Sequence, residues 1–487
     1  MVMLRIFRYL TIFFGFCLIL LCYFIHTVNI LYRQNEKDNW AEKVTFKYPR
    51  KVPGNDYYNV KNIVAYSLLK RIENESEEFS CGDDFRFPKN FEERGGLWTK
   101  VGGTGLYVLS VHFDTRLSPY NFIRIIGMTK GIPANKIYCQ IRSRNNTNHF
   151  TKAVITTIWS EEWNKNDVHS YFEPVLLSCR VPNVFKPKFV SLSTEPCGTP
   201  HSNFAIEAYN DTSRRLNFTI CVKPLVFNED ISEGLLQWIQ INEILGAQKI
   251  NIYYHLVNDR TKGILEWLQT NGKKIEVFYF EPIEGSIYPD GSEMDAEMVW
   301  QRRKYEVAAY NDCFYKNLNS DYVIPLDIDE IIVPKQENNW KDLFDTISGA
   351  LKDRFASFSV RNAYYFREPN NKTENEPVFF FRYASRSKLS GKEESGKSFI
   401  SSRNSLTVFN HYTLDTLRPG VGRTYFMTSN KVQLNHYKKN CSIVILPECE
   451  KYISSQRFLD YVIFKYKEEF RNNYCNIINR LKSVNIL

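Results

Sequence analysis

The stretch Tyr322-Val-Ile-Pro-Leu-Asp-Ile-Asp-Glu-Ile-Ile-Val-Pro334 places two acids, Asp327 and Asp329, between two apolar runs. Burying unpaired carboxylates is costly, so these two need partners. In an extended chain, residues two apart point to the same side, so both side chains can reach one cation. Carboxylate oxygens suit Mg²⁺ or Mn²⁺. The stretch therefore predicts a divalent-cation site, which a diphosphate can complete, although a lone Asp-x-Asp can also be a pair of surface acids.

The sequence before this stretch alternates between strand-like and helical patterns. Strands are predicted at 218–226, 249–254, 274–280 and 321–326, and helices at 232–245, 261–270 and 296–318. Such alternation favours βαβ units and a mostly parallel sheet with helices on its faces. In these sheets the ligand crevice lies beyond the carboxyl ends of the strands. Asp327 directly follows the fourth strand, which places the acids at that crevice.

Short apolar or alternating runs, separated by turn residues, fill the region from 81 to 200. They lie at 105–113, 122–128, 136–141, 153–159, 175–179 and 189–192. This spacing is typical of a small β-sandwich. Such a module could bind carbohydrate, or it could serve as a spacer or packing platform.

An apolar run near the N-terminus predicts a membrane anchor. It extends over residues 9–31 and follows Arg5 and Arg8, which favour a cytosolic N-terminus. A cleaved signal peptide is the alternative, but the run is long and lacks a small-x-small cleavage pattern. With a retained anchor, the bulk of the chain would be luminal.

Cysteines and glycosylation triplets fit a luminal location. Besides Cys17 and Cys22 in the apolar run, nine cysteines are scattered without a Cys-x-x-Cys pair, so we expect disulfides and no zinc cluster. Cys441 and Cys449 could close a small loop, and the odd number leaves at least one cysteine free or paired between chains. Asn-x-Ser/Thr triplets begin at Asn74, Asn145, Asn210, Asn217, Asn371 and Asn440.

The predicted organisation has five parts: a cytosolic tail (1–8), the anchor (9–31), a stem (32–80), a β-rich accessory module (81–212) and an α/β domain with a C-terminal helical extension (213–487). The net charge is +9, but the basic residues form no blocks, so we expect no nucleic-acid partner.

Four stretches make residues 215–440 resemble glycosyltransferase family 92, of the GT-A fold class. They are Cys221-Val-Lys-Pro224, Gly246-Ala-Gln-Lys-Ile-Asn-Ile-Tyr253, Asn311-Asp-Cys313 followed by Asp327-Ile-Asp-Glu330, and the late pair Val408-Phe-Asn-His411 and Leu434-Asn-His-Tyr-Lys438. The resemblance implies a GT-A-type domain that uses Mn²⁺ or Mg²⁺ and a UDP-sugar. The implied reaction transfers galactose from UDP-galactose, with inversion, to a glycan on a glycoprotein or glycolipid.

The resemblance also implies roles for individual residues. Asp327 and Asp329 would hold the metal, with His411 and His436 as further candidate ligands that could instead be structural. We assign Lys223, Tyr254, Asp312 and Lys397 to substrate binding; Lys397 could meet the donor phosphates or be a solvated surface lysine.

An inverting enzyme needs a general base, for which Glu330 and Asp415 are our candidates, with Glu394 in a polar loop as a third. Glu330 could instead brace the metal loop. The sequence departs from the family at Glu306, where Gln is common, and at Lys438, where Arg is usual. Because of these two departures, the donor could be UDP-GlcNAc in place of UDP-galactose. A catalytically inactive, carbohydrate-binding transferase fold is the alternative function.

Overall fold

The computed structural model describes residues 77–82, 97–131, 136–160, 171–200, 202–206, 215–271, 274–288, 296–366, 376–392, 394, 396–438 and 449–483. The predicted cytosolic tail, the anchor at 9–31 and nearly all of the stem lie outside these residues. Among the helices in the described ranges, none is long and apolar enough to cross a membrane. Residues from Tyr58 onward belong to one compact unit.

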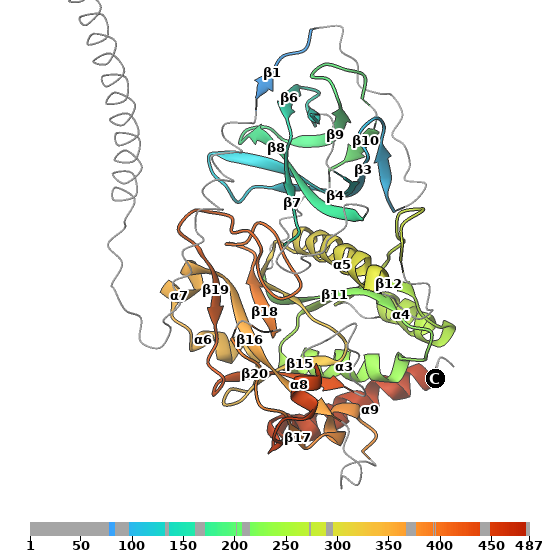
Figure 1. The fold of residues 1–487 in the computed structure, drawn as a ribbon, viewed down its shortest axis with the longest axis vertical. Coiled ribbons are helices and arrows are strands. Elements are labelled where there is room, and N and C mark those ends of the chain that lie inside the picture. Colours follow the sequence, from blue (N-terminus) through green and yellow to red (C-terminus); the bar gives the residue numbers. More distant parts are fainter. Residues whose placement is uncertain are drawn as a thin grey trace, which may run out of the picture. The chain divides into compact units, whose positions relative to one another are not determined.

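The first half of the described chain forms two antiparallel sheets of five strands (Figure 1). One sheet has the order β1-β6-β5-β9-β10 and the other β2-β3-β4-β8-β7. Their bounds are β1 Glu78–Phe79, β2 Thr99–Val101, β3 Leu106–Asp114, β4 Tyr120–Lys130, β5 Tyr138–Ser143, β6 Asn148–Lys152, β7 Val154–Thr157, β8 Phe172–Pro182, β9 Pro187–Ser193 and β10 Ser202–Ala205. Apolar side chains of both sheets share one core, as in a sandwich. We call these strands the β-rich module.

Disulfides connect distant parts of the chain, as the scattered cysteines predicted. Cys139–Cys179 joins β5 to β8, and hence one sheet of the β-rich module to the other, while Cys81–Cys197 ties down the segment around β1. Cys221–Cys313 joins the first strand of the following sheet to its long helix. Cys475 is unpaired and exposed. Cys441 lies outside the described residues.

The second half is built on a nine-stranded sheet, ordered β13-β12-β11-β14-β18-β16-β20-β15 with β19 beside β16. The four strands β13, β12, β11 and β14 are parallel, whereas β18 and β15 run antiparallel to their neighbours. The sheet is therefore mixed. The predicted parallel arrangement holds for the strands β13, β12, β11 and β14. The bounds are β11 Leu216–Val226, β12 Lys249–Leu256, β13 Ile275–Tyr279, β14 Ser320–Pro325, β15 Glu330–Pro334, β16 Phe355–Phe366, β18 Gly396–Ser401, β19 Gly422–Phe426 and β20 Val432–Lys438.

Helices connect the parallel strands. They are α3 Ser232–Leu245, α4 Asp259–Asn271 and α5 Ala296–Lys316, close to the predicted ranges. Gly246 ends α3 because it adopts a left-handed conformation (φ 117°), which lets its N–H bond to the carbonyl groups of Asn242 and Glu243.

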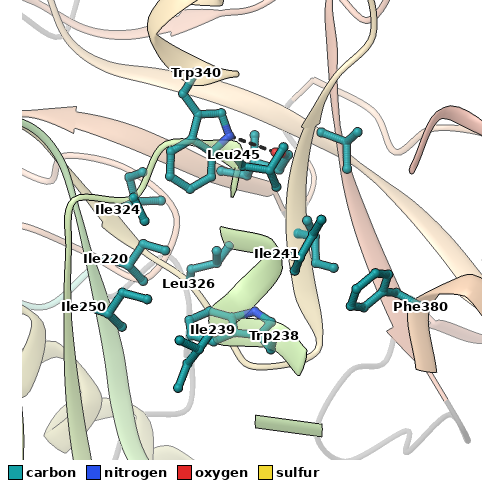
Figure 2. Packing of buried hydrophobic residues seen from close by; sticks show 14 of the residues in the cluster. Ile220, Trp238, Ile239, Ile241, Leu245, Ile250, Ile324, Leu326, Trp340 and Phe380 are labelled. Carbon is teal, nitrogen blue, oxygen red and sulfur yellow. Dashed lines mark hydrogen bonds between the residues drawn. The ribbon is translucent and has the colours of Figure 1, made fainter. Parts of the chain in front are cut away.

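The face of α3 that meets the sheet is apolar. Figure 2 shows Trp238, Ile239, Ile241 and Leu245 of this helix packed among strand residues such as Ile220 and Ile250. Two tryptophans add directed bonds: the indole N–H of Trp238 donates to the Glu330 carbonyl oxygen (2.8 Å), and that of Trp340 donates to the Ile332 carbonyl oxygen (2.9 Å). Both bonds fix the main chain of β15, which starts directly after the two acids.

The remaining elements complete the second half. They are α6 Trp340–Asp345, α7 Gly349–Arg354, the 3₁₀ turn η2 Phe379–Arg382, β17 Ser385–Arg386, α8 Cys449–Ile453, β21 Phe458–Leu459, η3 Val462–Tyr466 and α9 Lys467–Ser483. The last helix, α9, contacts α3 and η3.

Helix α5 lies between the β-rich module and β11 (Figure 1). Its buried side chains share one apolar cluster with Leu109, Phe122 and Leu176 of the module. Polar contacts cross the same boundary. The Gln301 side chain accepts a hydrogen bond from the Phe172 N–H (2.9 Å) and donates one to the Phe172 carbonyl oxygen (3.0 Å). The module is thus packed firmly against the helix that leads to the acids. The boundaries at 81 and 212 remain predictions.

We predict that Gln301→Leu destabilises the protein, because it leaves two main-chain groups of Phe172 without these partners. Each buried group that loses its hydrogen bond costs about 1–3 kcal/mol. A thermal melt should show a clear fall in melting temperature. Gln269→Leu, at an exposed position of α4, is the matched control and should melt like the original chain. An unchanged melting temperature in Gln301→Leu would contradict this view of the boundary.

Candidate active site

The acidic loop, residues 326–330, connects β14 to β15. It leaves the sheet at the carboxyl end of β14, beside β11, as the sequence predicted. The Glu330 N–H bonds to the Asp327 carbonyl oxygen (3.0 Å), and the Glu330 carboxylate accepts a hydrogen bond from the Asp327 N–H (3.1 Å). These two bonds close a tight turn. The turn holds three acids, Asp327, Asp329 and Glu330, on five residues of chain.

Three lysines pair with these acids. Lys397, on β18, lies 3.4 Å from Asp327 Oδ2 and 3.5 Å from Glu330 Oε2. Lys223, on β11, lies 3.3 Å from Asp327 Oδ2. Lys438, at the end of β20, lies 2.6 Å from Asp329 Oδ2. Lysines from three strands that are distant in sequence therefore surround the acidic loop.

Glu306 and Arg302 extend the group of charges. Glu306 Oε1 lies 3.3 Å from the ammonium of Lys223 and 3.3 Å from Arg302 Nε, one helical turn earlier on α5. Its other oxygen accepts a hydrogen bond from the Asn410 side chain (3.1 Å). We call the following eight residues the charged cluster: Lys223, Arg302, Glu306, Asp327, Asp329, Glu330, Lys397 and Lys438.

The surroundings set the pKa values of the acids. Burial alone would raise the pKa of Asp327, but the charges of Lys223 and Lys397 outweigh it and hold that pKa well below its ordinary value. Lys438, followed by His436, has the same effect on the pKa of Asp329. At Glu330 burial prevails and raises the pKa, against the charge of Lys397. The lysines therefore favour the ionised forms of Asp327 and Asp329.

His436 points into the acidic loop. Its Nε2 lies 3.4 Å from Asp329 Oδ2, and its Nδ1 lies 3.5 Å from Glu330 Oε1. The ring stacks on Tyr364 at 5.1 Å between ring centres. Both ring nitrogens are buried, and neither meets the geometry of a hydrogen bond to any residue that the structure describes. This is the surrounding expected of an imidazole whose polar partner is a bound group.

His411 lies beside β18. Its Nδ1 is 2.5 Å from the Gly396 carbonyl oxygen, and its own carbonyl oxygen accepts a hydrogen bond from the Ser398 hydroxyl. Burial, with the nearby charge of Lys397, lowers the pKa of His411 to about 3. The imidazole is consequently neutral at neutral pH. The nitrogen that faces the Gly396 carbonyl must carry the hydrogen.

Four of the residues predicted to act in the site have their contacts elsewhere. Glu394 pairs with Lys451 of α8 (2.5 Å). Asp312, on α5, accepts a hydrogen bond from the Tyr253 hydroxyl (2.6 Å) and pairs with Lys316 and with His112 of the β-rich module. Asp415 is buried and bonds to the Thr407 hydroxyl (2.8 Å), and burial raises its pKa. Tyr254, at the end of β12, packs against the Tyr279 ring. The structure brings together Lys223, Lys397, Asp327, Asp329, Glu330 and His436.

Four residues of the site were not assigned from the sequence, although the sequence pattern could have indicated each of them. Arg302, Glu306 and Tyr310 follow one another at single-turn spacing on α5. The Tyr310 hydroxyl lies 3.5 Å from Asp327 Oδ1. Lys438 follows His436 by two residues in a strand, so both side chains point to the same side. Helical and strand periodicity could have added all four.

The acids and His436 fit a shared divalent cation only with an added ligand. Within the described ranges, no three His, Cys, Asp or Glu side chains converge closely enough to hold a metal by themselves. The donor set of two ionised carboxylates and a buried imidazole without a hydrogen bond nevertheless suits Mn²⁺ or Mg²⁺. Oxygens of a bound diphosphate would supply the missing ligands.

Comparison with known proteins gives limited similarities outside the family match. A segment of 138 residues is 28% identical to the Caenorhabditis elegans protein named beta-1,4-galactosyltransferase galt-1; it covers 28% of this chain and 29% of that relative. Two solved structures align at 12% identity. GalNAc-T7 with UDP, GalNAc and Mn²⁺ gives a TM-score of 0.26 over 48% of this chain and 45% of that one. HddC from Yersinia pseudotuberculosis gives 0.24 over 49% and 98%.

The family match covers the sheet and the charged cluster. The family described as glycosyltransferase family 92 matches residues 217–474, slightly more than half of the 487 residues. The matched range begins in β11, contains every residue of the charged cluster and ends within α9. It confirms the resemblance that the four sequence stretches indicated. This chain belongs to glycosyltransferase family 92.

Proposed function

We propose that this glycosyltransferase transfers galactose from UDP-galactose to a glycan acceptor, with inversion and with Mn²⁺ or Mg²⁺ in its active site. The observation that carries the proposal is the acidic loop: two ionised carboxylates at the carboxyl end of a parallel strand, ringed by lysines. The four parallel strands and their helices support a GT-A-type domain. The predicted anchor and the cysteine pattern support a type II protein of the Golgi membrane.

We assign separate roles to His436 and to the residues of the charged cluster. Asp327, Asp329 and His436 would hold the cation. When bound, the cation would offset the charge that develops on the departing diphosphate. Lys223 and Lys438 are partly exposed, and their flexible stems let their ammonium groups approach phosphate oxygens as point charges.

Glu330 is better suited to bracing than to proton transfer. Its carboxylate is buried, bonds to the Asp327 N–H and lies within 3.5 Å of both Lys397 and His436. These contacts fix the main chain at Asp327 and orient the His436 ring. Of its two predicted roles, we therefore assign to Glu330 the support of the proposed metal ligands.

The choice of galactose rests on the family resemblance and on the name of the C. elegans relative. We would screen the purified full-length chain against a panel of nucleotide sugars, including UDP-galactose and UDP-GlcNAc, with and without Mn²⁺. Transfer from UDP-galactose alone, with Mn²⁺ present, is the expected result. Glycan binding without turnover of any donor would instead favour an inactive, carbohydrate-binding protein.

We expect Asp329→Ala to lower transfer at least about 10²- to 10³-fold, the loss typical when one electrostatic group at a reacting centre is removed. Asp345→Ala is the control, since Asp345 is an exposed acid on α6 that pairs only with Lys341 within the described chain. Radiolabelled sugar transfer measures activity, and thermal melting measures folding. Metal-dependent transfer at the original rate in a folded Asp329→Ala protein would refute the assignment.

His411 gives a prediction on pH. The unfolded chain binds a proton at His411 near pH 6.5, whereas the folded chain does so only near pH 3. Stability due to the neutral imidazole is therefore lost as pH falls from about 6.5 toward 3. We expect His411→Gln to show a smaller drop in melting temperature between pH 7 and pH 5 than the original chain, both measured in EDTA. Equal drops would show that this imidazole is not held neutral.

A further inference from the structure

The charged cluster already contains as many basic as acidic side chains. Four carboxylates (Glu306, Asp327, Asp329 and Glu330) are contacted by four permanent cations (Lys223, Arg302, Lys397 and Lys438). A divalent cation added alone would bring two further positive charges into this half-buried site. Added together with a diphosphate, it would leave the site near balance. The charges thus favour joint binding of cation and nucleotide.

The three lysines differ in how easily they can be displaced. Lys397 is only 3% exposed, and its ammonium is fixed between Asp327, Glu330 and the Asn410 carbonyl oxygen. Lys438 is 24% exposed and pairs with Asp329, which at 36% is the most exposed acid of the cluster. Lys223 is 25% exposed, but it is shared between Asp327 and Glu306. Lys438 is therefore the cation most readily exchanged.

Lys438 also pairs with the carboxylate oxygen that the metal would need. Its ammonium lies 2.6 Å from Asp329 Oδ2, and His436 Nε2 lies 3.4 Å from the same oxygen. A cation that uses this oxygen and this imidazole must push the ammonium aside. The flexible stem of a lysine permits that movement, because it makes a single point contact and not the two-pronged contact of an arginine.

From these contacts we propose that Lys438 is an internal counterion of Asp329 that makes cation binding depend on the nucleotide. Without nucleotide, Lys438 neutralises Asp329 and competes with the cation. With nucleotide, the displaced ammonium finds a new partner in the diphosphate, so the competition ends. The inference rests on the proposed function and adds to it a residue that couples the two ligands. Such coupling is reciprocal, so the cation tightens nucleotide binding by the same factor.

Mn²⁺ binding to the full-length chain tests the proposal without measuring transfer. Free Mn²⁺ is followed by its electron paramagnetic resonance signal, with and without saturating UDP, and corrected for the Mn²⁺ that UDP itself binds. In the original chain UDP should lower the Kd for Mn²⁺ by about 5- to 150-fold, the usual range for coupled sites. In Lys438→Gln, the Kd for Mn²⁺ without UDP should fall by about fivefold, as expected when one competing ion pair is removed. The effect of UDP should shrink.

Two further variants serve as controls. Lys438→Arg keeps the positive charge at Asp329 and should retain weak Mn²⁺ binding in the absence of UDP. Lys431→Gln removes a lysine that directly precedes β20 and bonds to the Thr346 hydroxyl, outside the charged cluster. It should bind Mn²⁺ like the original chain. Melting temperatures confirm that each variant is folded.

The outcomes separate this inference from the proposed function. Equally tight Mn²⁺ binding with and without UDP in the original chain would overturn the role of Lys438. So would a folded Lys438→Gln protein with an unchanged or higher Kd in the absence of UDP. Neither result would contradict the proposed metal site itself. Failure of Mn²⁺ to bind under any condition would overturn the metal site, and with it the counterion.

Discussion

The ammonium of Lys397, buried between Asp327 and Glu330, is the constraint on which the site depends. A charge this deeply buried is tolerated only with close partners, and the acids need it equally. Burial alone would lower the pKa of Lys397, yet Asp327 and Glu330 raise it, so the lysine stays charged. Lys397 lies on β18, which pairs with β14 and β16 in the middle of the sheet. The acidic loop is therefore anchored to the sheet by electrostatics as well as by its two strands.

Apolar packing positions this charge pair. Trp238 from α3 and Trp340 from α6 each donate a hydrogen bond to the main chain of β15, so the exit of the acidic loop is held by two rigid side chains. On the opposite side of the cluster, Glu306 and Tyr310 project from α5, whose other contacts reach the β-rich module. Site geometry thus depends on helices from both sides of the sheet.

The sequence predicted local structure well and long-range pairing poorly. Helix α3 has the predicted bounds because its apolar spacing and the following Gly246 are local signals. The parallel strands β11 to β14 follow from strand–helix alternation. Strands β15 to β20 could not be ordered, since β16 lies between β18 and β20 through contacts that no local pattern encodes. The same limit applied to the site: Asp327 and Asp329 stood out, but Asp312 has partners in β3 and β12 that only the fold brings near.

The shared core between α5 and the β-rich module limits how far the chain can be truncated from its N-terminus. Cutting the chain at 212 would keep the whole family-matched range, yet it would strip Gln301, Lys304 and Asp312 of Phe172, Glu173 and His112. It would also uncover the apolar side of the helix that carries Glu306 and Tyr310. Such a fragment would expose a large apolar surface to water, and we expect it to self-associate. We therefore expect that a stable, active fragment of this transferase must include the β-rich module.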